Sequence, residues 1–482
     1  MSPGLVAAVV SIYFLLLVVI SWITSGKASS DAFYTGNRQS PWYLVAFGMI
    51  GASLSGVTFI SVPGEVGNSN FYYFQIVLGY LAGYAVIALV LLPLYYRLNL
   101  ISIYEFLSIR LGFWSHKMGA LFFLLSRVIG ASFRLFLVAS VLQIGFFDAF
   151  GLPFAASVAT AILLIWVYTQ KGGIKTIVWT DTLQTLFMIL SVIVSIYLIK
   201  ENLNWDWSEL VGNVAADARS TIFDWKINSS TNFFKQFFSG AFIAIVMTGL
   251  DQDMMQKNLT CRSLKDAQKN VFWFSVVLVF VNILFLSLGI LLFQFVELNT
   301  LTMPERTDGL FPMVAIQHFS VFGGVVFLLG ITAAAYSSAD SALTALTTSF
   351  CIDFLGFKPE NFDKKKTLRR GVHLGFSLLL FFTVLIFNQV NDQSVITSVF
   401  VAAGYTYGPI LGLFVFGIYF KGDVQDKWVP VVCLISPVLS YVVKTYSPQI
   451  FWGYEFGFEI LIVNGLLTLI GLLLIKKKPA IN

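Results

Sequence analysis

A carboxylate and several hydroxyl groups share one face of a strongly apolar stretch in the second half of the sequence. Ser337, Asp340, Ser341 and Thr344 recur at three- and four-residue spacing, so in a helix they project from the same side. A carboxylate inside a membrane costs roughly 2.5–3.5 kcal/mol and usually faces a partner or an ion. Serines alone would more simply bond back to their own helix. With Asp340 among them, hard oxygen ligands for an alkali cation are the favoured interpretation.

Three further charged residues lie inside apolar stretches. Arg127 and Arg134 are seven residues apart, about two helical turns, and so lie on one face. A guanidinium keeps its charge and offers a fork suited to a carboxylate ligand. The alternatives are pairing with an intramembrane acid such as Glu65, or extension of Arg127 towards the inner surface. Asp181 lies near a helix start, where a favourable dipole interaction would by itself explain it.

Two apolar stretches contain residues that interrupt a helix. Residues 48–64 read GMIGASLSGVTFISVPG, in which Gly weakens a helix, Ser competes for its backbone bonds and Pro63 cannot donate one. A broken helix inside a bilayer is tolerated only where it is buried in protein or lines a cavity. The alternative is that the helix is unbroken and its glycines form a packing surface. A gentler interruption is expected at 248–251. Breaks at the starts of two halves are what an inverted repeat produces, with a substrate site between them.

The elements that carry these residues are predicted to be transmembrane helices. The sequence is 57% hydrophobic and 11% charged, whereas a soluble domain needs roughly a quarter of its residues charged. Apolar runs near twenty residues recur from end to end. We therefore expect an all-α membrane protein of about 13 transmembrane helices. Their expected ranges are 4–24, 42–66, 71–97, 117–147, 152–169, 174–199, 234–256, 267–296, 318–352, 369–388, 393–419, 428–445 and 455–475.

Charge and motif patterns limit orientation and function. No basic residue precedes the first apolar run, so we expect a retained helix rather than a signal peptide. Lys and Arg concentrate in the loops of one side, which predicts an outside N-terminus and a cytoplasmic C-terminus. The net charge of +5 then reflects topology, and no nucleic-acid partner is expected. The cysteines and histidines are scattered, which argues against a zinc site. The sequence has no phosphate-binding Gly-Lys-Ser/Thr loop, which argues against an ATP-driven pump. It also shows no catalytic constellation, which argues against an enzyme.

Several motifs resemble the sodium:solute symporter family, which includes sodium–glucose, proline and sialic acid symporters. They occur in the family's order and cover most of the chain. The segments YTQKGGI at 168–174 and TDTLQ at 180–184 resemble the family's signature across helices 4 and 5. Asp251-Gln252 followed by Gln256-Lys257 resembles the family's helix 6 motif. The helix 8 sodium motif resembles 334–338, and the family's helix 1 aligns with 51–64.

This resemblance implies a leucine-transporter-type fold in one domain, 1–482. Residues 42–199 and 234–419 would form two inverted repeats of five helices each. One extra helix at 4–24 precedes them, and two extra helices at 428–475 follow.

The resemblance also implies two cation sites. The principal sodium site would use backbone carbonyls and two hydroxyls of Gly51, Leu54, Ala334, Ser337 and Ser338. A second site, matching one in sialic acid members, would use Asp181, Ser337, Asp340 and Ser341. Those members have serine where this chain has Asp340, so we expect sodium there or a proton on Asp340.

The substrate positions depart from the sugar-transporting members. Polar residues of those members align with Val77, Leu278 and Phe400, so glucose or galactose is disfavoured. Ser55 and Thr58 match substrate-contacting positions of sialic acid members, whose carboxylate-binding arginine aligns with Gly130. Arg127 and Arg134 flank that position. The substrate-binding candidates are Ser55, Thr58, Gln75, Arg127 and Arg134, with Glu65 nearby.

The expected function is sodium-coupled import of a small solute, favouring an organic anion such as a sialic acid or another carboxylate. A neutral polyol, nucleoside, vitamin or amino acid is the alternative, and a membrane sensor or channel is the alternative of another class. Sodium is the coupling ion and no other cofactor is expected. The partners are the solute and the bilayer, and we expect a monomer in a bacterial inner membrane.

Overall fold

The computed structural model describes residues 2–24, 38–169, 174–358, 364–390 and 395–477. Residues 170–173 of the helix 4–5 signature therefore lie outside the described residues. The described chain is helical, with isolated bridges (Ser40–Cys261, Val424–Lys476) but no strand. Its α-helices are α1 (Pro3–Thr24), α3 (Trp42–Ser53), α4 (Gly56–Ser69), α5 (Tyr73–Val86), α6 (Leu92–Leu98), α7 (Glu105–Arg110), α8 (Phe113–Gly145), α9 (Phe154–Thr169), α10 (Ile174–Asn202), α11 (Trp207–Ala216), α12 (Phe233–Ala244), α13 (Gln252–Asn258), α14 (Leu264–Leu298), α15 (Leu310–Met313), α16 (Val321–Ser349), α17 (Lys366–Val390), α18 (Val395–Thr406), α19 (Gly408–Tyr419), α20 (Val429–Ile450) and α21 (Ile460–Leu474).

The apolar helices identify an integral membrane protein. Of the helices that the structure describes, eight are long and apolar enough to cross a bilayer, judged by length and composition. The number rises to as many as ten if each of two bent helix pairs is one span. The all-α membrane class predicted from composition is thus confirmed. Helices α3, α9 and α21 are apolar but shorter.

The predicted interruption of the second apolar stretch is present between α3 and α4. Leu54 has φ −82° and ψ 63°, and Ser55 has an extended ψ of −179°, so neither continues the helix. The backbone N–H of Leu54 still donates to the Ile50 carbonyl at 2.7 Å. Gly51 is therefore helical, and the break lies at Leu54 and Ser55 within the stretch 48–64. Pro63 does not interrupt the chain, because it lies inside the continuous helix α4.

The interruption in the second half is sharper than the gentle one expected. A π-helical turn, Ile245–Gly249, follows α12, and α13 then leaves at an angle of 71°. Asp251 caps the new helix, because its side chain accepts hydrogen bonds from the backbone N–H groups of Asp253 (3.0 Å) and Met254 (3.3 Å). This cap allows α13 to begin in a new direction. Helices α18 and α19 bend by 47° in a similar way.

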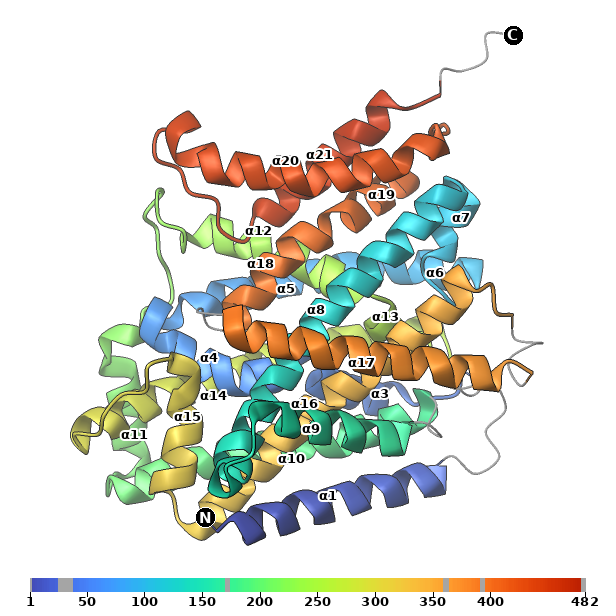
Figure 1. Ribbon diagram of the computed structural model, residues 1–482. Helices are drawn as coiled ribbons and strands as arrows, with labels where there is room; N and C mark the ends of the chain where they lie inside the picture. The colour runs from blue at the N-terminus through green and yellow to red at the C-terminus, as the bar shows by residue number, and fades with distance from the viewer. Residues whose placement is uncertain (1, 25–37, 170–173, 359–363, 391–394, 478–482) are drawn as a thin grey trace, which may run out of the picture.

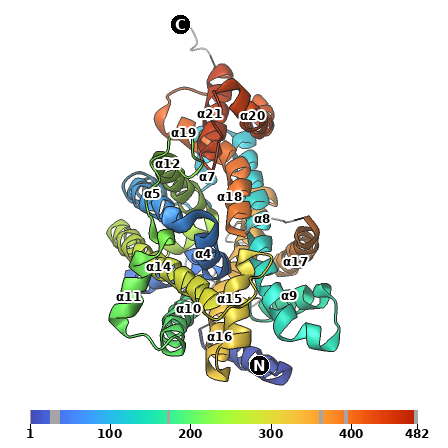
Figure 2. The same cartoon turned by 90° about the vertical axis from the view of Figure 1, so that its left-hand side faces the viewer.

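Small residues bring the broken helices close to their neighbours. Helix α3 packs on α10, α4 packs on α14, and α16 packs on α10, α8, α4 and α3. A Cβ added at Gly51 would overlap the side chain of Thr185 in α10, and one at Gly240 in α12 would overlap the Ile76 carbonyl of α5. Both views place α20 and α21 at one end of the molecule and α1 at the opposite end (Figures 1 and 2). The two breaks lie between these ends.

Candidate functional site

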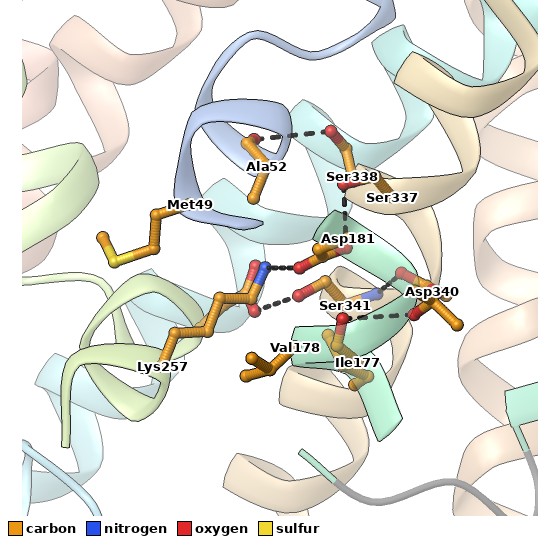
Figure 3. Close-up of polar contacts among 12 residues, drawn as sticks. Met49, Ala52, Ile177, Val178, Asp181, Lys257, Ser337, Ser338, Asp340 and Ser341 are labelled. Carbon is orange, nitrogen blue, oxygen red and sulfur yellow. Dashed lines mark hydrogen bonds and ion pairs between the residues drawn. The ribbon is translucent and has the colours of Figure 1, made fainter. Parts of the chain in front are cut away.

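The α3–α4 break meets the middle of α16. The hydroxyl of Ser338 lies 3.5 Å from the carbonyl oxygen of Ala52 and 3.4 Å from that of Ala334, as Figure 3 shows for Ala52. Gly51 precedes Ala52 directly, Leu54 follows it by two residues, and Ser338 is 1% exposed. The structure thus brings the two segments of the expected principal sodium site together. The α3 oxygen that contacts Ser338 belongs to Ala52, a residue that sequence comparison did not single out.

Asp181 of α10 is buried beside α16 and α13. Its Oδ1 accepts a hydrogen bond of 2.9 Å from the Ser337 hydroxyl. Its Oδ2 lies 2.8 Å from Nζ of Lys257, which extends from α13 (Figure 3). Both side chains are buried, with 0% and 1% of their surface exposed. Two expected members of the second cation site are therefore in contact, and an unexpected lysine holds the same carboxylate.

The other two expected members of that site lie one turn further along α16. The backbone N–H of Ser341 donates to Asp340 Oδ1 at 2.5 Å, while the Ser341 hydroxyl donates to Asp253 Oδ1. Asp340 and Ser341 are 0% and 1% exposed. Asp253 belongs to α13, as Lys257 does. Side chains of α13 therefore contact both the Asp181 half and the Ser341 half of the expected site.

Arg127 is held by acidic residues of the second break. Its Nη1 lies 3.5 Å from Asp251 Oδ2, and its Nη2 forms an ion pair with Asp253. The hydroxyl of Tyr407, between α18 and α19, donates to Asp251 Oδ2 at 2.7 Å. The alternative in which Arg127 pairs with an intramembrane acid is thus confirmed in kind. Its partners are Asp251 and Asp253 rather than Glu65.

A cavity between the two breaks contains most of the substrate candidates. Its empty volume is about 740 Å³, and Ser55, Thr58, Arg127 and Arg134 all line it. Leu278 and Phe400 also line it, whereas Val77 is 0% exposed. Other polar groups on its wall are Tyr73, Tyr80, Tyr84, Thr248 and Asn282.

Arg134 differs from Arg127 in its electrostatic surroundings. It is 8% exposed, and its Nε has no hydrogen-bond partner. Among the residues that the structure describes, no carboxylate forms an ion pair with its guanidinium. A buried cation without a nearby anion is costly. Arg134 therefore lines the cavity without a direct ion-pair partner among the described residues.

Gln75 has a structural position instead. Its amide Nε2 donates to the carbonyls of Thr231 (2.9 Å) and Tyr72 (3.2 Å), and its Oε1 accepts from the backbone N–H of Asp224 at 3.2 Å. The side chain is 0% exposed. These bonds attach α5 to the segment before α12, and Gln75 does not line the cavity.

A second, larger hollow adjoins the cavity. Its empty volume is about 1020 Å³, and Glu65 and Lys444 are on its wall. Tyr73 and Phe400 line both spaces, and their rings stack with centroids 6.3 Å apart and planes 6° apart. This aromatic pair and Ile396, which also lines both spaces, lie between the cavity and the hollow, which we call the vestibule.

Three polar residues of the site were missed by sequence reasoning. Asp253 and Lys257 were available as a signal, because they place an acid and a base four residues apart at the polar end of the apolar stretch 234–256. Lys257 entered only as part of a motif. Tyr407 gave no signal, since its contact with Asp251 depends on the bend between α18 and α19.

Comparison with known proteins agrees with this arrangement. A family profile described as "SSF: Sodium:solute symporter family" matches residues 33–423. The chain is 25% identical over 461 residues to the sodium/sialic acid symporter NanT of Aliivibrio fischeri, covering 92% of this chain and 88% of that one. It is 24% identical over 427 residues to the human sodium/iodide cotransporter, covering 84% and 65%.

Solved structures resemble the fold over nearly the whole chain. A sodium-coupled sialic acid symporter in a substrate-bound outward-open state superposes with a TM-score of 0.82 at 19% identity, covering 98% of this chain and 99% of that one. A nucleobase-cation-symport-1 family transporter in a closed conformation gives a TM-score of 0.55 at 13% identity, covering 91% and 92%. With the family profile matched along most of its length, this chain belongs to the sodium:solute symporter family, whose members are transporters rather than enzymes.

Proposed function

We propose that this protein imports a small organic anion together with sodium. The observation that carries the proposal is the position of Arg134, whose guanidinium has no ion pair within the described chain and lines the same cavity as Ser55 and Thr58. A guanidinium in such a cavity suits a carboxylate, and the hydroxyls supply further hydrogen bonds. The relatives named for sialic acid and for iodide also carry anions.

Sodium is the coupling ion, and we assign it to two sites. The principal site consists of Gly51, Leu54, Ala334, Ser337 and Ser338, to which the Ala52 carbonyl is added because it faces Ser338. The second site consists of Asp181, Ser337, Asp340 and Ser341 and takes sodium, or a proton on Asp340. The contact of Ser337 with Asp181 supports a link between the two sites.

The proposed architecture has 13 transmembrane helices and two inverted repeats, 42–199 and 234–419, flanked by 4–24 and 428–475. The breaks at α3–α4 and α12–α13, one near the start of each repeat, support this layout. The N-terminus lies outside and the C-terminus is cytoplasmic. The protein is a monomer of a bacterial inner membrane.

The proposed mechanism is alternating access. Sodium at the principal site joins the α3–α4 break to α16 and favours the outward-open state, and the solute then occupies the cavity. One charge moving through 100 mV supplies roughly 2.3 kcal/mol, and a tenfold gradient adds about 1.4 kcal/mol. Two sodium ions with a monovalent anion therefore supply about 5 kcal/mol, enough to concentrate the anion on the order of a thousandfold.

A thermal-shift screen of the purified protein tests the substrate class. Small carboxylates, including a sialic acid, are compared with uncharged solutes, each in sodium chloride and in choline chloride. We expect at least one carboxylate to raise the unfolding temperature in sodium only, because the ion orders the break beside the cavity. Equal stabilisation by the uncharged amide of the same compound would contradict the anion assignment and favour a neutral solute.

A further inference from the structure

Lys257 is a lysine whose charge is buried within the proposed cation region. Its side chain is 1% exposed, and it extends from α13, the short helix that follows the second break. Lysines are rarely buried to this degree unless they are paired. Its partner is Asp181, whose Oδ2 lies 2.8 Å from Nζ (Figure 3).

This contact uses the carboxylate that the proposed second cation site requires. Oδ1 of Asp181 accepts a hydrogen bond from Ser337, and Oδ2 holds the ammonium. A sodium ion bound to Asp181 needs the same negative charge. Two positive charges sharing one buried carboxylate repel each other strongly in a medium of low dielectric constant. The ammonium and the ion therefore exclude one another.

We propose that Lys257 is a tethered cation that competes with the second sodium ion for Asp181. This inference rests on the proposed second site, which contains Asp181, and adds a residue that controls its occupancy. When sodium binds, the ammonium leaves Asp181. When sodium departs, the ammonium returns, so that the empty site does not hold an uncompensated buried carboxylate.

The surroundings of Lys257 give the displaced ammonium an alternative acceptor. Asp253 lies four residues earlier on the same helix, at the spacing at which side chains face each other. Its Oδ1 accepts from Ser341, and its Oδ2 is paired with Arg127. The flexible four-carbon stem of lysine permits such a movement. A shift of Lys257 to Asp253 would connect ion entry with the Arg127 side of the substrate cavity.

Competition of this kind lowers the apparent affinity for the second ion. If the ammonium occupies Asp181 for about nine-tenths of the time, the apparent dissociation constant is raised about tenfold. Replacing Lys257 by an uncharged residue of similar length removes the competitor. The second ion is then expected to bind at about tenfold lower sodium concentration.

The test titrates the purified full-length protein with sodium, at constant ionic strength in choline, and follows tryptophan fluorescence and unfolding temperature. Wild type is compared with Lys257→Met and Lys257→Gln. The matched control is Lys235→Met, since Lys235 of α12 is also buried but its Nζ contacts the Glu455 carbonyl and the Tyr454 ring. We expect the midpoint of one sodium transition to fall to an about tenfold lower sodium concentration in both Lys257 variants and to stay unchanged in the control.

Two further variants keep the test decisive. In an Asp181→Asn background, Lys257→Gln is expected to have no effect on the sodium titration, because the shared ligand is gone. Lys257→Arg retains the charge. Because arginine forms a bidentate ion pair with a carboxylate, we expect this variant to bind the second sodium ion about tenfold more weakly. This variant serves if the uncharged ones do not fold.

The outcomes separate the inference from the proposed function. If the second sodium ion binds Lys257→Met and Lys257→Gln at the same or a higher concentration than wild type, the competition is overturned while sodium-driven uptake stands. An unchanged sodium affinity in Lys257→Arg overturns it in the same way. If uptake by the wild-type protein is itself indifferent to sodium, the proposed function and the inference fail together.

Discussion

Two arginines on one face of α8 have different electrostatic environments. Arg127 is paired with Asp251 and Asp253, which belong to the second break, and Arg134 has no ion pair among the residues described. Their seven-residue spacing predicts the shared face. It cannot predict the difference, because the acids come from a segment far away in the sequence and reach Arg127 only through the bend before α13.

At the residue scale, Arg134→Gln is expected to weaken solute binding about 10- to 100-fold. This range corresponds to the roughly 1.5–3 kcal/mol of a hydrogen bond to a charged group. Since Arg134 has no ion pair in the described chain, its loss leaves no carboxylate unpaired and should not lower the unfolding temperature. Solute titration of the purified protein measures the first effect, and calorimetry measures the second. Unchanged affinity would remove Arg134 from the binding site.

Arg127→Gln provides the matched comparison. It leaves Asp251 and Asp253 without their cation, and breaking a buried pair costs about 3–5 kcal/mol. We therefore expect a lower unfolding temperature from this variant, measured by the same calorimetry. An unfolding temperature equal to that of wild type would show that the two acids do not depend on Arg127.

Asp340→Asn tests the second cation site. The substitution removes one of the two carboxylates assigned to it while preserving the size of the side chain. We expect a lower sodium Hill slope and a smaller charge-to-solute ratio in vesicle uptake, because one coupled cation is lost. If both quantities stay at their wild-type values, Asp340 takes no part in coupling.

At the scale of elements, the sequence predicted where the backbone would break but not how the break would be built. Glycine, serine and proline in 48–64 predicted an interrupted helix. The break lies at Leu54 and Ser55, because Leu54 still bonds to Ile50, whereas Pro63 lies inside α4. The second break was underestimated, since its 71° bend depends on a π-helical turn and on the Asp251 cap. Neither feature has a periodic signature in the sequence.

Gly51 sets the distance between α3 and α10. The Thr185 hydroxyl lies 3.0 Å from the Phe47 carbonyl and 2.7 Å from the Asp181 carbonyl, and a Cβ at Gly51 would overlap it. Gly51→Ala is therefore expected to destabilise the protein by about 1–3 kcal/mol and to weaken sodium binding. The unfolding temperature and a sodium titration measure these effects.

Gly375→Ala in α17 is the control for Gly51→Ala. Nothing lies within 4 Å of the Cβ that this substitution adds, so stability should stay equal or rise slightly. Equal stability of the two variants would show that the close contact of Gly51 with Thr185 does not contribute to stability.

At the scale of the whole molecule, two hollows lie in series. The cavity with Arg134 and the vestibule with Lys444 share Tyr73 and Phe400, whose stacked rings stand between them. The sequence predicted the class of protein from composition and the family from motifs. It could not predict this arrangement, because Tyr73 and Phe400 come from α5 and α18 and meet only after the helices pack.

Phe400→Ala is expected to connect the two hollows and to release bound solute up to about tenfold faster, given roughly 0.5–1.5 kcal/mol for an aromatic pair. Phe400→Tyr should behave as wild type because it retains the ring. Phe382→Ala, on the exposed face of α17, is the control for loss of a phenyl group. Release of labelled solute from the purified protein measures the rate. An unchanged rate in Phe400→Ala would show that the ring does not close the cavity.

The central claim is that downhill sodium entry drives solute accumulation through the Ser338 site. Reconstituted vesicles, supplied on the outside with a carboxylate identified in the thermal-shift screen, measure it directly under an inward sodium gradient and under an equal choline gradient. We predict accumulation above the external concentration in sodium only, and its loss in Ser338→Ala. Equal accumulation with choline in place of sodium would contradict the account.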